Sequence, residues 1–298
     1  MRLLVCNDLH LKPDANDHDV DAMSVPDGLD AVLIVGDLTH RDGPADVRLA
    51  RSFVEQFDTE CPVFYVPGNH DHAPMPTKVV AEVPTAQSGH EAVLELKGLT
   101  VVGWGCEQRS LTDALDQTEF PAIDARTAPR GERRYAADQA AADIEAACYD
   151  VVTGAETVAD VAERLGIESE NHGAFHRALD EIADTYESLS ELLDGRRDVL
   201  LASHLSPFNT SFDRHHSKGT REEDLEELHT GSIALKLAVR THDVYGTVTG
   251  HSHAFGYDTG GEDGGRPHDL NLGFRGMSVV DVDPAAGVFS FTHPDAIR

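Results

Sequence analysis

Lysine, cysteine and long hydrophobic runs are all scarce in this sequence. Five of the 298 residues are lysine, and the four cysteines are scattered without a C-x-x-C pair. The cysteine spacing disfavours a disulfide framework or a zinc knuckle and favours buried free thiols. No run of 18 apolar residues is present, so no membrane span is expected. The first residues lack a charged segment followed by a hydrophobic signal region, and we therefore expect a cytoplasmic protein.

Basic residues are also few relative to acidic residues. Lysine and arginine number 24 against 53 aspartates and glutamates, for a formal net charge of −29. The acidic residues are spread along the chain, which is typical of a high-salt cytoplasm, because the Debye length is about 3 Å at 1 M salt and self-repulsion is screened. A surface for a cationic partner is the alternative. The lack of a basic stripe disfavours extended nucleic-acid binding, which depends on lysines and arginines that displace counterions.

Five mostly apolar runs, rich in valine and leucine, predict buried strands of an α/β sheet. The runs are Arg2–Cys6, Ala31–Val35, Val63–Val66, Val199–Ala202 and Tyr245–Val248. Further elements are predicted at Pro44–Phe57 (helix), 92–103 (hairpin), 232–239 (helix), and 270–273, 277–282 and 288–292 (antiparallel strands joined by turns). The length and the 40% of apolar residues suit one large domain or a domain with an insertion.

Residues 105–197 differ from the rest of the chain, because they are rich in alanine, glutamate and aspartate and lack strand-like patterns. Apolar residues between Phe175 and Leu193 recur at spacings of four and three, which predicts one apolar face of a long helix. A shorter helix is predicted over Val158–Leu165, and its acidic surroundings argue against DNA recognition. We predict a single domain over residues 1–298, with residues 105–197 as a helical insertion or cap. Its apolar helix face is expected to pack on the domain or on a second subunit of a homo-oligomer.

Each of the five predicted strands is followed closely by a short polar motif. The motifs are Asp8-Leu9-His10, Gly36-Asp37, Gly68-Asn69-His70-Asp71, His204 and Gly250-His251-Ser252-His253. In an open α/β sheet, ligand sites lie beyond the carboxyl ends of the strands. Aspartate, asparagine and histidine offer oxygen and nitrogen ligands, so these strand ends predict one site that holds two metal ions.

The spacing within the motifs indicates which side chains share an ion. In a strand, side chains at i and i+2 point to the same side, so Asp8 and His10 are expected to converge, as are His251 and His253. Asp37 follows a glycine that lets the backbone turn tightly, and its carboxylate can bridge two cations. Mixed nitrogen and oxygen ligands without thiolates suit Mn, Fe, Zn or Co, of which Mn is favoured, and disfavour a closed structural zinc site.

The order D-x-H, GD, GNH(D/E), H and GHxH resembles the pattern of the calcineurin-like metallophosphoesterase superfamily, over residues 1–104 and 198–298. The resemblance implies an α/β (α+β) fold: a two-sheet β-sandwich flanked by helices in four layers, with two divalent metal ions at one edge. Carried over by position, it implies Asp8, His10 and His253 as ligands of one ion, Asn69, His204 and His251 as ligands of the other, and Asp37 as the bridge.

The resemblance also implies a reaction. Two cations about 3.5–4 Å apart lower the pKa of a bridging water and hold the phosphoryl oxygens of an in-line displacement. His70 is expected to act as the general acid toward the leaving group, with Asp71 orienting it. His40, in the loop that follows Asp37, and Arg275, in Asn-Leu-Gly-Phe-Arg-Gly, are expected to contact the substrate phosphate.

Variants of the motifs separate the branches of the superfamily. Protein serine/threonine phosphatases carry GDxxDRG and RGNHE, whereas this chain has GDLTHRDG and PGNHD. The stretch from Ser203 to Thr210, followed by Asp213, His229 and GHSH, is similar to small metallophosphodiesterases. It departs from them at Phe208, which replaces a second proline, and in an insertion before His229. We therefore predict a phosphodiesterase that acts on a small phosphate ester.

A DNA or RNA nuclease and a phosphomonoesterase of the same superfamily are the alternatives. A repair nuclease would share His40, but such enzymes carry a further capping domain after GHxH, for which too few residues follow His253. A non-catalytic scaffold that kept the fold is an alternative of another class. Scaffold relatives typically lose metal ligands or the general-acid histidine, whereas all the ligand positions and His70 are present here.

Overall fold

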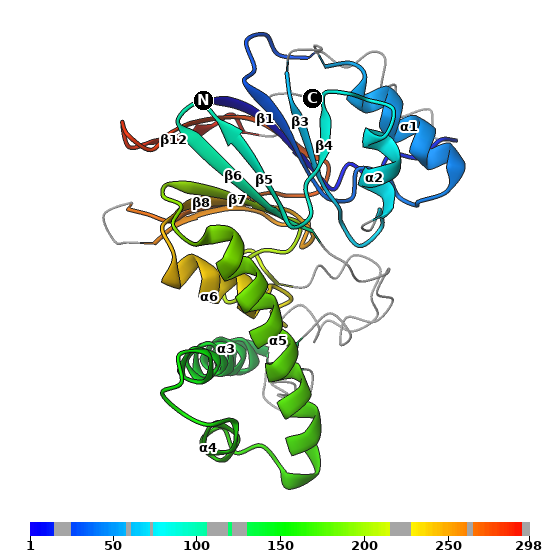
Figure 1. Ribbon diagram of the computed structural model, residues 1–298. Coiled ribbons are helices and arrows are strands. Elements are labelled where there is room, and N and C mark those ends of the chain that lie inside the picture. Colours follow the sequence, from blue (N-terminus) through cyan, green and yellow to red (C-terminus); the bar gives the residue numbers. More distant parts are fainter. Residues whose placement is uncertain are drawn as a thin grey trace. The chain divides into compact units, whose positions relative to one another are not determined.

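The structure is a computed structural model that describes most of the chain (Figure 1). The described residues are 1–14, 25–57, 61–71, 74–105, 119–120, 130–214, 228–260 and 265–293, with the backbone alone for 130–137. They divide into two compact units, of which unit 1 contains residues 1–110, 192–205 and 243–298 and unit 2 contains residues 111–191 and 206–242. The described strands belong to unit 1, and most of the described helical residues belong to unit 2.

The first sheet of unit 1 has the strand order β12-β11-β1-β2-β3-β4. Its strands are β1 (Arg2–Asn7), β2 (Ala31–Val35), β3 (Val63–Val66), β4 (Ala86–Ser88), β11 (Gly276–Asp283) and β12 (Val288–Phe291). Strands β1 to β4 are parallel, whereas β11 is antiparallel to both β1 and β12. The register pairs Leu3 with Ala31 and Val32 with Val63, so the carboxyl ends of β1, β2 and β3 reach the same edge.

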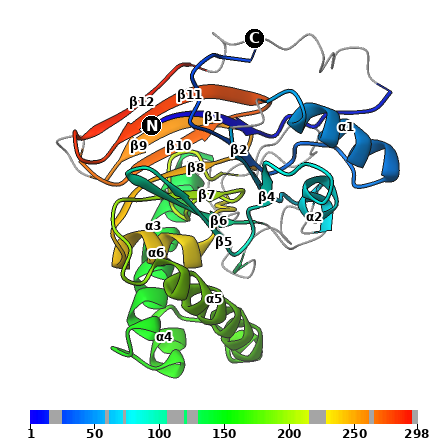
Figure 2. The ribbon, with the colours of Figure 1, turned by 45° about the horizontal axis from the view of Figure 1, so that its top comes forward.

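The second sheet has the order β5-β6-β7-β8-β10-β9. Its strands are β5 (Ala92–Leu96), β6 (Leu99–Trp104), β7 (Val199–Ser203), β8 (Val244–Thr249), β9 (Phe255–Thr259) and β10 (His268–Leu272). Strands β6, β7, β8 and β10 are parallel, and the edge strands β5 and β9 are antiparallel to their neighbours. Both ribbon views show the sheets as two layers (Figures 1 and 2). The predicted two-sheet sandwich flanked by helices is confirmed.

Strand β1 shows why the predicted strands are apolar on both faces. Leu3 and Val5 belong to the core between the sheets, together with Leu200 of the second sheet. Leu4 and Cys6 face the other way, into a core that helices α1 and α2 complete. These helices are α1 (Pro44–Val54) and α2 (Pro74–Val80). A strand buried on both sides cannot alternate with polar residues, and its sequence becomes a continuous apolar run.

Two predictions about unit 1 are corrected by the structure. The helix predicted over Pro44–Phe57 ends at Val54. Residues 270–273 do not join an antiparallel group with the two strands that follow them. Strand β10 lies in the second sheet, parallel to β8, while β11 and β12 pair in the first sheet. The connection at residues 273–275 carries the chain between sheets, and a local apolar pattern does not report which sheet a strand joins.

The structure tests the predictions about the cysteines and about membrane spans. Cys6 and Cys148 are buried free thiols, as predicted, Cys61 is buried as well, and Cys106 lies outside the described residues. Within the described ranges, every helix is too short or too polar to cross a membrane.

Unit 2 is built mainly from helices. They are α3 (Arg130–Val152), α4 (Val158–Arg164), α5 (His172–Leu193) and α6 (Ile233–Thr241), with a short 3-10 helix at Ser169–Asn171. The hydroxyl of Thr157 accepts from the backbone amide of Asp160, whose carboxylate bonds back to the amide of Thr157, so α4 begins with a capping box. The predicted apolar face of α5 is buried at Phe175, Leu179, Ile182 and Leu189. Helix α3 contacts α4 (Figure 2). The bounds 105–197 for an insertion stay a prediction.

Candidate metal centre

The loops that follow β1 and β2 run alongside each other. The backbone amides of Asp8 and His10 donate to the carbonyls of Gly36 and Asp37 at 3.1 and 2.9 Å. The amide of Leu11 continues the series at 2.9 Å. Backbone pairing between the two chain segments therefore extends beyond the regular strands, and it presents the ligand residues of both loops side by side.

Five of the predicted ligands have a left-handed backbone conformation. Their φ angles are 48° at Asp8, 47° at His10, 53° at Asp37, 69° at His251 and 56° at His253. This conformation costs about 1–2 kcal/mol for a residue with a Cβ atom, so the surrounding contacts must hold it. Strand β1 ends at Asn7 and β8 ends at Thr249. The alternation of side chains along a strand is therefore not what makes these ligands converge, contrary to our reasoning from the sequence; turns beyond the strand ends aim them.

The first group of candidate ligands consists of Asp8, His10 and His253. Their ligand atoms all lie within 4.8 Å of one another. Nε2 of His10 is 3.2 Å from Nε2 of His253, and Oδ1 of Asp8 is 3.6 Å from the same Nε2 of His253. Oδ1 of Asp8 is buried and accepts no hydrogen bond. Two imidazole nitrogens and a carboxylate oxygen arranged in this way are a suitable donor set for a divalent cation.

The second group consists of Asn69, His204 and His251. Oδ1 of Asn69 is 3.0 Å from Nε2 of His204 and 3.2 Å from Nδ1 of His251. His204 is fully buried, and its Nδ1 lies 3.1 Å from the carbonyl oxygen of Val35. A proton on Nδ1 would be donated to that carbonyl, which leaves the lone pair of Nε2 directed at a cation. This group thus offers neutral oxygen and nitrogen donors.

Asp37 lies between the two groups. Its Oδ2 is 3.6 Å from Nε2 of His10 and 3.6 Å from Nε2 of His204. Burial and the nearby carboxylates of Asp71 and Asp8 raise the pKa of Asp37 well above its ordinary value. Two cations bound on either side would stabilise its ionised form. The donor set therefore fits a pair of divalent ions that share this carboxylate.

Burial also sets the protonation of the first group. Desolvation lowers the pKa of His10 to about 3, although the carboxylate of Asp8 acts in the opposite direction. For Asp8, burial raises the pKa, but His253, His204 and His10 together lower it well below its ordinary value. A neutral imidazole and an ionised carboxylate at neutral pH are the forms that bind metals.

Two glycines allow the close approach of the ligand loops. Gly36 has a φ of 82°, and a Cβ atom there would overlap the imidazole of His204. A Cβ atom at Gly68 would overlap the carboxylate and the backbone nitrogen of Asp37. The glycines of the GD and GNH motifs are therefore required by packing, and at Gly36 also by backbone conformation.

His70 and His40 lie next to the candidate ligands. Nε2 of His70 is 4.0 Å from Oδ2 of Asp37, and its ring stacks on that of His40 with centroids 5.0 Å apart. The ring of His70 also meets that of His10 at 90°, with centroids 4.8 Å apart. Burial lowers the pKa of both His40 and His70. The structure thus brings both predicted substrate-side histidines to the candidate metal centre.

Asp71 is placed differently from our prediction that it orients His70. Its carboxylate accepts hydrogen bonds from the backbone amides of Asp37, Leu38 and Gly68 and from the hydroxyl of Tyr65. The ring of His70 is held instead at Nδ1, which lies 3.2 Å from the carbonyl oxygen of His40. Asp71 therefore ties the loop after β3 to the loop after β2, and it positions Asp37 through the backbone.

Arg275 lies in the connection between β10 and β11. Its φ is 54°, and its backbone amide donates to the carbonyl of Asp8 at 3.0 Å. Its guanidinium carbon lies 5.3 Å from the ring centroid of Phe274. That ring lies 4.9 Å from His253 and 5.8 Å from His10, measured between centroids. The connection that carries Arg275 therefore reaches the first ligand group.

The sequence reasoning missed two buried asparagines that support the ligand loops. Nδ2 of Asn7 donates to Oδ2 of Asp8 at 2.6 Å and to the carbonyl of Gly273 at 3.0 Å. Nδ2 of Asn271 donates to the carbonyl of Gly250 at 2.6 Å. Both asparagines are fully buried. A polar residue at the end of, or inside, an otherwise apolar run was the signal that could have identified them.

Asp213 and His229, the middle part of the phosphodiesterase-like motif, make their described contacts within unit 2. Asp213 accepts hydrogen bonds from Nδ1 of His229 at 2.5 Å and from the backbone amide of Asn209 at 2.9 Å, and both members of the Asp213–His229 pair are buried. Arg214 and His229 both face Asp138 of α3. These contacts fix the loop, and the groups of potential metal donors found among the described residues all belong to unit 1.

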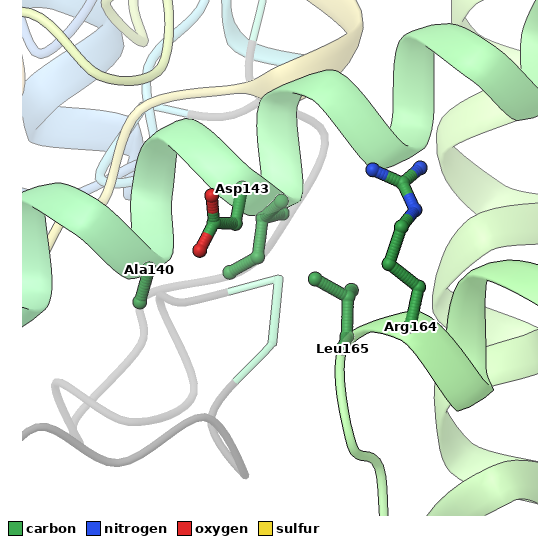
Figure 3. A pocket seen from close by; sticks show the side chains of 5 residues that line it. Ala140, Asp143, Arg164 and Leu165 are labelled. Carbon is green, nitrogen blue, oxygen red and sulfur yellow. The ribbon is translucent and has the colours of Figure 1, made fainter.

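A cavity of about 310 Å³ lies in unit 2 (Figure 3). Its described lining residues are Ala140, Asp143, Ile144, Arg164 and Leu165. The guanidinium of Arg164 donates to the carboxylates of Asp150 and Glu156 at 2.8 Å each. The positive charge of Arg164 at this cavity is therefore already paired. The cavity is separate from the candidate metal ligands, because all of them belong to unit 1.

Comparison with known proteins adds one family match. The family described as calcineurin-like phosphoesterase matches residues 1–255, which contain every candidate metal ligand. No curated protein matches the chain. Among solved structures, it is similar to a phosphopantetheinyl hydrolase from Mycobacterium tuberculosis (14% identity, 91% of this chain and 88% of that chain covered, TM-score 0.48). It is also similar to a dimetal phosphatase from Danio rerio (12% identity, 94% and 92% covered, TM-score 0.45).

Proposed function

We propose that this chain acts as a phosphodiesterase on small diesters. The chain belongs to the calcineurin-like phosphoesterase family and is therefore a metal-dependent phosphoester hydrolase. The observation that carries the proposal is the arrangement of nitrogen and oxygen donors on both sides of Asp37, whose Oδ2 is 3.6 Å from His10 and from His204. The buried Oδ1 of Asp8 supports it too, because it accepts no hydrogen bond and a buried ionised oxygen is costly in that state.

Two divalent cations, with Mn favoured, would supply Lewis-acid activation of water and of the phosphoryl oxygens when bound. The side chains that would hold them are Asp8, His10 and His253 for one ion, Asn69, His204 and His251 for the other, and Asp37 for both. Only two of these side chains are carboxylates. The bound pair therefore keeps positive charge toward the anionic diester, despite the acidic surface of the whole protein.

His70 is the group that we assign to the leaving ester oxygen. Its Nδ1 is held against the carbonyl of His40, so Nε2 faces the centre and can deliver a proton there. The stacked ring of His40 restrains the orientation of His70 from its flat side. We assign to His40 and Arg275 the role of contacting the phosphate, with Arg275 anchored by its backbone bond to Asp8.

A small substrate suits the charge of the chain. A net charge of −29 leaves little support for a long nucleic-acid footprint, which favours a small phosphodiester over a nuclease substrate. We infer a cytoplasmic location without a membrane partner, and we assign homo-oligomer contacts to the helical region.

The first experiment compares a generic aryl phosphodiester with the matching monoester, in molar KCl, with Mn²⁺ added back to chelator-stripped protein. We expect diester hydrolysis that disappears without metal. Hydrolysis of the monoester alone would move the protein to the phosphomonoesterase alternative. Two bound metals without hydrolysis of either ester would favour the scaffold alternative.

The variant His70→Asn separates an enzyme from a scaffold within the same assay. Loss of a general acid lowers turnover by about 10²–10⁴-fold, whereas the ligand set is unchanged and metal content should be retained. His176→Asn is the matched control, because its imidazole lies 60% exposed on α5 and pairs with Asp180. Equal turnover of the two variants would contradict the role of His70.

We also infer that the acidic surface suits high salt. Between low and molar KCl, screening of self-repulsion should raise the melting temperature of the protein. A melting temperature that stays constant or falls over this range would contradict the inference.

A further inference from the structure

Phe274 is one of the few large apolar side chains exposed among the described residues, at 37% of its surface. Its ring lies against two candidate ligands of the first group: 4.9 Å from His253 at 49° and 5.8 Å from His10 at 32°. Isolated exposed apolar side chains are common on protein surfaces. This ring differs from them because it lies beside the place where the substrate phosphate must bind.

The connection that carries Phe274 is fixed on both sides. Gly273 has a φ of 74°, and its carbonyl accepts a hydrogen bond from Nδ2 of Asn7 at 3.0 Å. Arg275 has a φ of 54°, and its amide donates to the carbonyl of Asp8 at 3.0 Å. Both neighbours of Phe274 are therefore tied to the end of β1 and its first loop residue. Such anchoring sets the place of the ring before a substrate arrives, which reduces the entropic cost of using it for binding.

The surroundings of the ring suit a flat, electron-rich group attached to an anion. The guanidinium of Arg275 lies 5.3 Å from the centroid of the ring and adds positive charge near the aromatic face. The leaving ester oxygen is assigned to His70, whose ring stacks on His40. Both rings contact His10, but Phe274 lies against His253, whereas His70 lies against His40, so Phe274 is placed for the other ester group of a diester.

We propose that Phe274 is a specificity-determining residue, whose ring stacks on an aromatic group in the ester that does not leave. The inference rests on the proposed phosphodiesterase function and narrows its substrates to diesters with an aryl or nucleoside group. Phe274 positions the substrate and takes no part in proton transfer.

The test uses three diesters with the same leaving group: methyl p-nitrophenyl phosphate, bis(p-nitrophenyl) phosphate and thymidine 5′-p-nitrophenyl phosphate. The measured quantity is kcat/KM of the full-length, Mn-loaded protein and of Phe274→Ala and Phe274→Leu. Loss of one aromatic stack should lower kcat/KM about two- to ten-fold for the aromatic esters, mainly through KM, and leave the methyl ester unchanged. The two aromatic esters together show whether the ring accepts an aryl group, a nucleoside or both.

Binding provides a second readout that does not need turnover. Phenylphosphonate and methylphosphonate both present a phosphonate to the metals, and they differ only in the organic group. We expect calorimetry to show tighter binding of phenylphosphonate to the wild-type protein, and loss of that preference in Phe274→Ala. Phe255→Leu is the matched control, because Phe255 is 42% exposed and its ring contacts are to Phe291 and His293.

The outcomes separate this inference from the proposed function. An unchanged preference for aromatic groups in Phe274→Ala, or an equal loss for the methyl ester, would overturn the role of Phe274. Failure of the wild-type protein to hydrolyse any of the three diesters would contradict the phosphodiesterase assignment. The ratio of phenylphosphonate to methylphosphonate affinity would still decide the role of Phe274 in that case.

Discussion

The ligand edge of unit 1 and the helices of unit 2 follow different local rules. At the edge, five candidate ligands have φ angles between 47° and 69°. In unit 2, a capping box begins α4 at Thr157, the side chain of Ser232 caps α6, and Gly166 with a φ of 67° follows α4. Among the described residues of unit 2, Asn209 is the only one other than glycine with a positive φ.

The difference shows which parts of this protein lower the free energy of unfolding and which parts raise it. Left-handed ligand residues and desolvated carboxylates destabilise the folded state, so the two apolar cores of unit 1 must offset them. Helices whose capping residues and apolar faces agree with their structure do not have the conformational cost of left-handed ligand residues. Five of the nine described non-glycine residues with a positive φ are candidate ligands, so disagreement between residue type and backbone is concentrated at the candidate site.

The substitution with the largest expected effect is Asp37→Asn, because Asp37 lies between both ligand groups. Loss of the shared negative charge should remove several kcal/mol of transition-state stabilisation, so turnover should fall by more than about 1,000-fold. Metal content per protein should fall as well. The control is Asp14→Asn, at an exposed position. Retention of both metals and of normal turnover in Asp37→Asn would remove the bridging role.

A smaller effect is expected from Asn7→Ala, which keeps every ligand and removes their support. Asn7 bonds to Oδ2 of Asp8 at 2.6 Å, and loss of such a partner typically lowers metal affinity or activity by about 10–100-fold. Titration of stripped protein with Mn²⁺ measures the change. Gln56→Ala, at a half-buried position after α1 and outside the ligand loops, should bind metal like the wild type. Equal affinity in Asn7→Ala would mean that the surrounding backbone suffices to hold the loop.

Glu119 is a titratable carboxyl of unit 2 whose pKa is shifted by burial, and it provides a test of the comparison between the two units. Burial raises the pKa of Glu119 from 4.5 to about 8, and its carboxylate accepts from the amide of Ile233 at 3.0 Å. The unfolded chain releases this proton at lower pH than the folded chain does. Stability should therefore fall as the pH rises from about 4.5 to about 8 and should change little above that.

The variant Glu119→Gln keeps an acceptor for the amide of Ile233 and removes the titration. At pH 4, below the pKa of the unfolded chain, its melting temperature should match the wild type, and at pH 8.5 it should be higher, on the order of 5 °C. The exposed Glu168→Gln serves as the control. A wild-type melting temperature with no decline between these pH values would contradict the prediction for Glu119.

The smallest effect is expected from Thr157→Ala, which removes the capping box of α4. Loss of an N-cap costs about 1 kcal/mol of helix stability, so protection of the α4 amides against hydrogen exchange should decrease. Metal affinity should not change, because the candidate ligands belong to unit 1. A change in metal affinity of Thr157→Ala would show that the two regions depend on each other.

Much of the framework could be predicted from short patterns. Strands β2 and β3 coincide with the predicted runs Ala31–Val35 and Val63–Val66, since continuous burial leaves a continuous apolar signature. The structure also brings the predicted ligand residues to one edge, although their role in binding metal stays a prediction. Short elements such as β4 (Ala86–Ser88) went unpredicted because few residues carry little pattern.

The sequence itself determines where most strands lie along the chain, which residue types follow them and to which family the chain belongs. Each of these depends on local burial or on a motif. The tertiary structure alone decided that β10 joins the second sheet, that turns aim the ligands, and that Asp71 holds backbone amides while the carbonyl of His40 holds His70. It also placed Phe274 against His253. These relations join residues far apart in the chain, and they depend on the packing of both sheets at once, which no local pattern records.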